Sequence, residues 1–170
     1  MKKLLSALAF AAIAFSSVTS HALLIEPFIG YGMGDYEGDD TTGLEYGGRL
    51  GFTLAVVDIG GEFAKGDFDA DRDTGGDLNL ETTDMGLFIA IEFPILLRAY
   101  ATYFLSSEAK PGTGTKMEGD GGYRLGVGFT GLPFLSINLE QTLRKWDEQG
   151  SSSISEDMSM TMLSISLPLP

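Results

Sequence analysis

About eight runs of alternating apolar and polar residues fill the sequence after residue 22, and the connections between them alternate in character. Successive residues of a β-strand point to opposite faces, so each run predicts a strand with one apolar face. The connections are short and apolar at 55–58, 93–96 and 131–134, but long and polar at 35–43, 66–79, 106–121 and 147–157. Long loops gathered at one end are typical of a membrane barrel, in which the other rim only turns the chain.

The alternation is clearest at 44–54, 84–93, 97–105, 123–129 and 136–144, and weaker at 24–34 and 57–65. The run at 158–167 is irregular: Met158 to Met162 place methionines on one face, whereas Leu163 to Leu167 place aliphatic residues on the other. A β-bulge near Met162 would reconcile the two faces, and we predict one there. No later segment has the 18 consecutive apolar residues of a membrane-spanning helix, so any crossing of lipid would need a closed barrel.

The first 22 residues have the features of a secretory signal peptide. Lys2 and Lys3 precede the apolar run Leu4–Phe15, and Ser20-His21-Ala22 places small residues where signal peptidase reads them. The apolar run is shorter than the roughly 20 residues that span a bilayer. We expect cleavage after Ala22, with a retained anchor as the alternative, and a single domain over 23–170.

Composition limits the chemistry. The chain has no cysteine and one histidine, His21, which lies inside the predicted signal. Catalysis by Ser-His-Asp or Cys-His and a standard zinc site are therefore excluded after cleavage. We expect no enzyme and no cofactor. The formal net charge of −13 argues against a nucleic-acid partner.

Charges of both signs lie on the polar face of the predicted strands, and we expect this face to line the barrel interior. An eight-stranded barrel has an interior just wide enough for side chains, and unpaired buried charges are costly. We predict a paired lumen network that plugs the barrel; the alternative is a narrow conduit. Its predicted members are Arg49, Glu62, Glu92, Arg98, Arg124 and Glu140. Arg144, Glu45 and Asp84 are expected nearer the outer rim, in solvent.

Four tyrosines share the apolar face and lie near the strand ends that lead into long loops. Aromatic residues at one level of a membrane barrel form a girdle at the lipid–water interface. We predict such a girdle from Tyr31, Tyr46, Tyr103 and Tyr123, with Trp146 as a further interface anchor.

The loop Asp67–Asp73 has aspartates at alternate positions, Asp67, Asp69, Asp71 and Asp73. It lacks the glycine and the glutamate that complete an EF-hand loop, so we predict no metal site of that kind. A solvated acidic loop is the preferred interpretation, and weak binding of divalent cations is the alternative.

With these motifs in place, the sequence resembles the small eight-stranded outer-membrane β-barrels of Gram-negative bacteria, a family that includes OmpX, OmpW and the OmpA transmembrane domain. The resemblance lies in Glu26–Gly34, Gly43–Leu54 and Gly122–Thr130 and extends over 23–170. It implies an all-β, antiparallel, up-and-down transmembrane barrel in the bacterial outer membrane. Its implied partners are outer-membrane lipid, lipopolysaccharide, periplasmic chaperones and the barrel-assembly machinery. Family members usually end in an aromatic residue, whereas this sequence ends Leu167-Pro168-Leu169-Pro170.

We therefore expect a monomeric barrel with a structural or surface-interaction role, through envelope integrity, adhesion or recognition by acidic loops. One alternative is an OmpW-like or porin-like conduit for small solutes or apolar molecules. The other is a soluble, secreted, lipocalin-like binding barrel, although the early Gly-x-Trp motif of lipocalins is absent, because Trp146 is the only tryptophan.

Overall fold

The computed structural model describes residues 21–72, 78–112 and 114–169. The predicted signal peptide lies almost entirely outside the described residues. Nine antiparallel β-strands account for nearly all of the described chain. They are β1 (His21–Tyr36), β2 (Asp39–Leu54), β3 (Val57–Asp71), β4 (Leu78–Phe93), β5 (Leu97–Pro111), β6 (Met117–Gly119), β7 (Tyr123–Leu132), β8 (Leu135–Gln149) and β9 (Ser152–Ser166). No helix that could cross a membrane occurs in this part of the chain.

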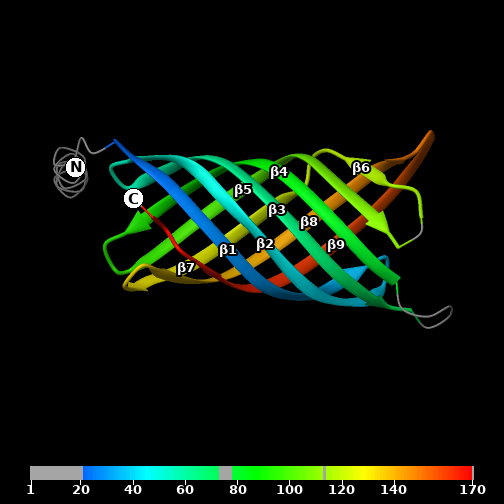
Figure 1. The fold of residues 1–170 in the computed structure, drawn as a ribbon, viewed down its shortest axis with the longest axis horizontal. Coiled ribbons are helices and arrows are strands. Elements are labelled where there is room, and N and C mark those ends of the chain that lie inside the picture. The colour runs from blue at the N-terminus through cyan, green and yellow to red at the C-terminus, as the bar shows by residue number, and fades with distance from the viewer. Residues whose placement is uncertain (1–20, 73–77, 113, 170) are drawn as a thin grey trace, which may run out of the picture.

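The strands close into a barrel (Figure 1). Each strand from β1 to β5 pairs with the next, β5 pairs with β7, and β7 to β9 continue the ring until β9 pairs with β1. The three-residue β6 lies between β5 and β8 beyond the end of β7, so β6 and β7 share one position in the ring. This arrangement confirms the prediction of an all-β, antiparallel, up-and-down barrel with eight strand positions.

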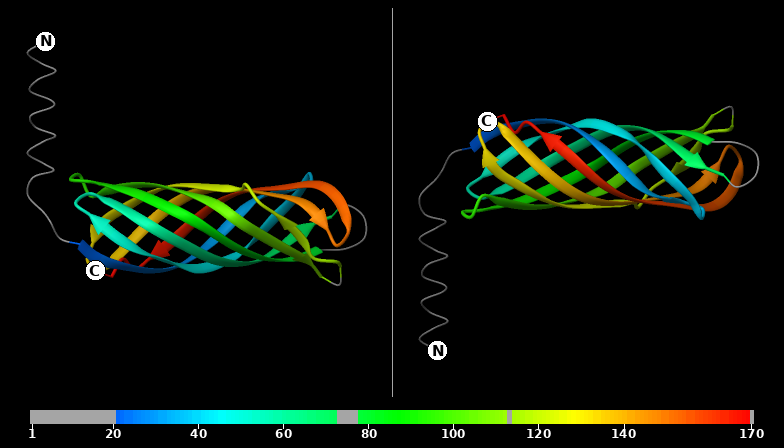
Figure 2. Two further views of the ribbon diagram at one scale, coloured as in Figure 1. Left: turned by 90° about the horizontal axis from the view of Figure 1, so that it is seen from above. Right: turned by 90° about the horizontal axis from the view of Figure 1, so that it is seen from below.

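The two ends of the barrel differ (Figures 1 and 2). The described chain begins and ends at the same end, together with the connections β2–β3, β4–β5 and β7–β8; we call this the short-turn end. Ala55, Leu96 and Phe134 adopt positive φ angles of 60°, 62° and 60° in these turns. The opposite end, which carries the connections β1–β2, β3–β4, β5–β6 and β8–β9, is the extended end.

The prediction of long loops at the extended end is wrong for two of the four connections. Only Glu37 and Gly38 separate β1 from β2, and their φ angles of 55° and 93° suit the tight turn of a two-residue hairpin. Only Gly150 and Ser151 separate β8 from β9. The polar segments are continuations of the strands, because a polar strand end keeps its backbone hydrogen bonds even where its side chains face water.

Large apolar side chains cover the outside of the barrel wall. Leu50 is 61% exposed and Leu87 is 60% exposed, and similar residues occur on every long strand. Burying such side chains in an apolar medium releases about 1.5–3 kcal/mol each, so a continuous belt of them favours a lipid environment. The alternation expected from the sequence therefore has its large apolar face outwards. We call this surface the apolar belt.

The predicted bulge near Met162 is wrong. The β1–β9 register runs without a shift from Phe28↔Ser166 to Tyr36↔Met158. Met158, Met160 and Met162 are buried inside the barrel, whereas Leu163 and Ile165 face outwards. No bulge is required because the apolar side of β9 changes from the inner face, up to Met162, to the outer face, from Leu163 onwards.

Candidate functional site in the barrel interior

Glycines on the inner face make room for the large side chains that fill the barrel. Gly126 on β7 lies opposite Tyr100 on β5, and a Cβ atom at Gly126 would overlap the tyrosine ring. A Cβ atom at Gly66 would likewise overlap the ring of Phe68. The glycine-rich polar face of the strands is thus a packing requirement: small residues on one strand accommodate rings from the same or neighbouring strands.

Arg49 on β2 is the centre of a buried ion-pair network. Its side chain is fully buried, and its guanidinium contacts three carboxylates. The Nε atom lies 2.6 Å from Glu62 Oε2, Nη1 lies 3.3 Å from Glu26 Oε1, and Nη2 lies 3.4 Å from Glu140 Oε1. The guanidinium carbon also lies 4.7 Å from the ring centre of Phe28 and 4.4 Å from that of Tyr100. Arg49 is therefore held by charge and by cation–π contact together.

The network continues toward the short-turn end through Glu26. Both of its carboxylate oxygens accept hydrogen bonds from Arg98 on β5, one of them at 2.8 Å from Nη1. Glu26 and Arg98 have fully buried side chains. Glu26 therefore bridges Arg98 and Arg49 across the barrel, since β1 and β5 lie on opposite sides of the ring.

Toward the extended end, Arg124 and Arg144 carry the network onward. Arg124 pairs with Glu45, with Glu62 at 2.9 Å from Nη1 and with Glu140 at 3.5 Å from Nε. Arg144 pairs with Glu45 and, at 2.8 Å from Nε, with Asp84. The ion pairs thus form one connected chain from Arg98 to Asp84. We call it the lumen network: Arg49, Arg98, Arg124, Arg144, Glu26, Glu45, Glu62, Asp84 and Glu140.

Neutral donors complete much of the hydrogen bonding of these carboxylates. Thr102 donates to Glu62 at 3.0 Å, Ser164 donates to Glu140 at 2.7 Å, and Tyr100 also donates to Glu140. Ser107 donates to Asp84 at 2.6 Å. Buried charges are tolerated only when such additional hydrogen bonds accompany the ion pair. The interior therefore holds a polar core in which the carboxylates meet both arginines and neutral donors.

The structure places five of the six predicted lumen charges in this network and corrects the sixth. Glu92 is exposed at the short-turn end and forms no ion pair within the described residues. It has the inward parity of β4 but stands at the last inward position, where the barrel opens to water. The prediction that Arg144, Glu45 and Asp84 are solvated is also wrong, because all three are buried.

Besides Glu45, Asp84 and Arg144, which the sequence placed at the rim, the network has a fourth member that was not predicted at all, Glu26. The available signal was its parity: Leu24 and Phe28, two residues to either side, face inwards with it. A carboxylate between two inward residues of a barrel strand needs a cationic partner, as Arg49 and Arg98 provide.

A second, apolar layer fills the barrel between the lumen network and the extended end. Its members are contributed by strands all around the ring, and we call it the apolar plug: Tyr36, Phe68, Ala70, Leu80, Ala109, Met117, Trp146, Met158 and Met160. The prediction of Trp146 as an interface anchor is wrong, because it is 1% exposed inside the barrel. Its Nε1 donates to Ser107 Oγ at 3.1 Å, which joins the plug to the network through Asp84.

The four predicted girdle tyrosines all face outwards. Tyr103 and Tyr123 are direct cross-strand partners on β5 and β7, whereas Tyr31 and Tyr46 lie on the neighbouring strands β1 and β2. Their exposed fractions are 50%, 55%, 55% and 42% for Tyr31, Tyr46, Tyr103 and Tyr123. The tyrosines therefore form two pairs on opposite sides of the barrel, each within the outward apolar surface.

The predicted acidic loop is in large part a strand. Asp67, Asp69 and Asp71 lie on the outward face of β3, and Asp73 lies outside the described residues. Asn79 on β4 donates a hydrogen bond to Asp67 at 2.6 Å. Within the described ranges, no group of three or more acidic or histidine side chains is arranged to hold a metal ion.

Comparison with known proteins finds similarity in structure but not in sequence. No protein-family model matches the chain, and no curated protein sequence matches it either. Neisserial surface protein A superposes with a TM-score of 0.61 at 8% identity, covering 88% of this chain and 99% of the other. Ail, the attachment invasion locus protein of Yersinia pestis, was solved in complex with the heparin analogue sucrose octasulfate. It superposes with a TM-score of 0.57 at 13% identity and covers 89% and 100%.

A second structure of Ail gives a TM-score of 0.54 at 11% identity over 86% and 97% of the two chains. Identities this low carry over the fold alone. These superpositions agree with the closed ring of strands and the outward apolar belt. This chain therefore has the fold of the small eight-stranded outer-membrane β-barrels.

Proposed function

We propose that the protein is an integral barrel of the bacterial outer membrane, with a closed lumen and a structural or surface-interaction role. The apolar belt supports the membrane location, because side chains such as Leu50, Leu87 and Leu163 are more than half exposed in the isolated chain. A soluble lipocalin-like barrel would bury these side chains and expose the charges. Because outer-membrane barrels have their short turns on the periplasmic side, the short-turn end of this barrel would face the periplasm and the extended end would face the outside.

The observation that carries the closed lumen is its filling by two layers. The fully buried guanidinium groups of Arg49, Arg98, Arg124 and Arg144 are paired to carboxylates across the interior. The apolar plug covers them from the extended end. An eight-stranded barrel leaves no further width for a water column, so an OmpW-like or porin-like conduit is the less supported candidate.

The extended end presents mainly carboxylates to its surroundings. Outward or rim positions carry Asp35, Glu37, Asp39, Asp67, Asp69, Asp71, Glu81, Glu108, Glu118, Asp120, Asp147, Glu148 and Asp157, against fewer basic side chains. Ail holds a polyanionic heparin analogue in its complex, but a carboxylate surface repels such a ligand. We propose a cationic partner, or a cation-bridged contact with lipopolysaccharide, for this surface. The role is passive, with no enzymatic step.

The closed lumen is tested by the conductance of refolded protein in planar lipid bilayers. We expect no single-channel steps, whereas an open porin inserted under the same conditions conducts. Folding of the protein is verified by its heat-dependent mobility on gels. Stepwise conductance from such folded protein would refute the closed lumen. Fractionation of expressing cells tests the location, and recovery in the soluble periplasmic fraction would refute the membrane assignment.

A further inference from the structure

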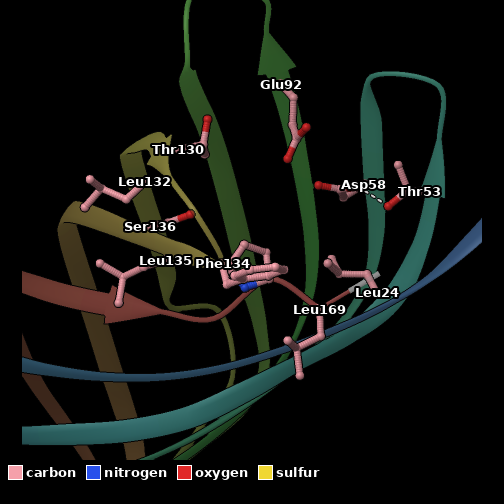
Figure 3. A pocket seen from close by; sticks show the side chains of 11 residues that line it. Leu24, Thr53, Asp58, Glu92, Thr130, Leu132, Phe134, Leu135, Ser136 and Leu169 are labelled. Carbon is pink, nitrogen blue, oxygen red and sulfur yellow. Dashed lines mark hydrogen bonds between the residues drawn. The ribbon is translucent and has the colours of Figure 1, made fainter.

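A pocket of about 440 Å³ opens at the short-turn end of the barrel (Figure 3). It lies on the short-turn side of the lumen network and is separate from the acidic surface of the extended end. Its volume is in the range of small-molecule sites, which are about 300–1,000 Å³. The mouth of the barrel is therefore large enough to hold a small ligand without displacing the lumen network.

One wall of the pocket is acidic. Asp58 on β3 and Glu92 on β4 both point into it (Figure 3). Asp58 pairs in register with Ala90, so Glu92 is its diagonal neighbour on the same face, about 7–8 Å away for this geometry. Because both side chains point into the same pocket, one ammonium group can lie between the two carboxylates. Neither carboxylate forms an ion pair within the described residues, and the pocket lining contains no basic side chain.

Asp58 is a buried carboxylate that lacks a cation. Its side chain accepts a hydrogen bond from Thr53 Oγ1 at 2.7 Å, which fixes its position, and the residue is only 2% exposed. The nearest arginine of the network, Arg98, is already occupied by both oxygens of Glu26. A buried negative charge with one neutral donor favours a bound cation.

The wall opposite the carboxylates carries an uncharged polar group, and the surface between the two walls is apolar. Ser136 on β8 is fully buried, and its hydroxyl has no hydrogen-bond partner in the described part of the chain, although it lines the pocket. β8 stands across the ring from β3. Leu24, Phe134 and Leu169 supply apolar surface between the two walls (Figure 3). Two carboxylates with apolar walls do not supply the six or more oxygens that Ca²⁺ or Mg²⁺ requires.

We propose that this pocket binds a small amphipathic amine, with its ammonium group between Asp58 and Glu92, its apolar body against Phe134 and Leu169, and a polar group at its far end hydrogen-bonded to Ser136. The ligand class follows from three parts of the pocket. The two carboxylates favour a cation, the apolar surface between the walls favours an apolar middle, and the unpartnered hydroxyl of Ser136 favours a hydroxyl or amide.

Tyramine is a suitable probe because it has an ammonium group and a phenol at opposite ends of one ring. Binding is followed by amide chemical shifts of the refolded protein in lipid nanodiscs. We expect saturable shifts at the short-turn end. Tyrosol, in which a hydroxyl replaces the amine, should bind at least about tenfold more weakly, since a charge-assisted contact is lost. Phenethylamine, which lacks the phenol hydroxyl, should bind a few-fold more weakly than tyramine. Equal binding of tyramine and tyrosol would overturn the proposal.

Matched variants separate the pocket from general charge effects. The double variant D58N/E92Q should lose the preference for tyramine over tyrosol. D120N/E148Q, which removes two exposed carboxylates at the extended end, should keep it. If D58N/E92Q fails to fold, Ser136→Ala serves instead: it keeps both carboxylates and should make tyramine bind no better than phenethylamine. An unchanged preference in D58N/E92Q, its loss in D120N/E148Q, or an unchanged tyramine affinity in Ser136→Ala would each contradict the pocket.

Discussion

Replacing Arg124 by methionine tests whether the lumen network stabilises the fold through charge. Methionine keeps most of the volume of the arginine stem but removes the guanidinium that joins three carboxylates, Glu45, Glu62 and Glu140. The network described here has four arginines and five carboxylates. The substitution therefore raises its excess negative charge from one to two in a fully buried site.

Removing one partner of a buried ion pair costs about 3–5 kcal/mol, because the remaining charge stays buried. Each carboxylate here keeps one other cation: Glu62 keeps Arg49 at 2.6 Å, Glu140 keeps Arg49 at 3.4 Å, and Glu45 keeps Arg144. We therefore expect Arg124→Met to lower the free energy of unfolding by about 3 kcal/mol, at the low end of that range. Adding Glu45→Gln restores the original excess of one negative charge and should recover at least about 1 kcal/mol.

The free energy is measured by guanidinium unfolding of the protein in detergent micelles. Trp146, the only tryptophan, reports on the fold because it lies inside the barrel next to the network. Lys116→Met is the matched control, since it also removes one positive charge but from an exposed contact with Glu108 and Glu118; its midpoint should not shift. A loss below about 1 kcal/mol for Arg124→Met, or no recovery in the double variant, would refute a charge-based role.

Three further predictions address the plug and the packing. Trp146 should not be quenched by lipids with brominated acyl chains, whereas a tryptophan at Tyr103 in a Trp146→Phe background should be; quenching of Trp146 would place it outside the barrel. Burial and a hydrogen bond to a glutamate raise the pKa of Tyr36, beyond the apolar belt, above its ordinary value of 10. Its neutral form is favoured in the folded state, so stability should fall as the pH rises above about 10, and Tyr36→Phe should reduce this slope; an unchanged slope would contradict it. Gly126→Ala should lower stability by about 1–3 kcal/mol through overlap with an aromatic ring. Gly48→Ala, whose Cβ would meet only an atom at 3.8 Å, should cost less in the same unfolding assay, and equal losses would count against the packing argument.

The fold and the faces of the strands could be predicted from the sequence because both depend on local alternation. Arg49 and Arg124 sit at inward positions of regular strands, and the period of two is enough to place them. The height of a residue along the barrel is a different matter, since it depends on strand length, tilt and shear, which pairing determines.

Arg144 and Glu45 illustrate that difference. The sequence places each of them near a rim, because the polar residues beyond it are typical of loops. In the structure β8 continues to Gln149 and β2 begins at Asp39, so both residues lie well inside the barrel. Glu92 shows the opposite error: it has the right parity but the wrong height. No local signal distinguishes a polar loop from a polar strand whose outer face meets water.

The remaining errors share one physical cause, which β3 shows most directly. Near the middle of this strand Phe63 faces outwards and Glu62 faces inwards; further toward the extended end Asp67 and Asp69 face outwards and Phe68 faces inwards. The apolar side thus changes from the outer to the inner face within one regular strand. Outside the barrel, lipid favours apolar side chains and water favours polar ones, whereas the interior holds paired charges at one level and packed apolar side chains nearer the extended end. This change explains why Trp146 and Met158 belong to an internal plug and why β9 needs no bulge. For a barrel in the proposed membrane location, it places the outer edge of the membrane on β3 between Phe63 and Asp67, a boundary that only a height-dependent interpretation of the alternation can find.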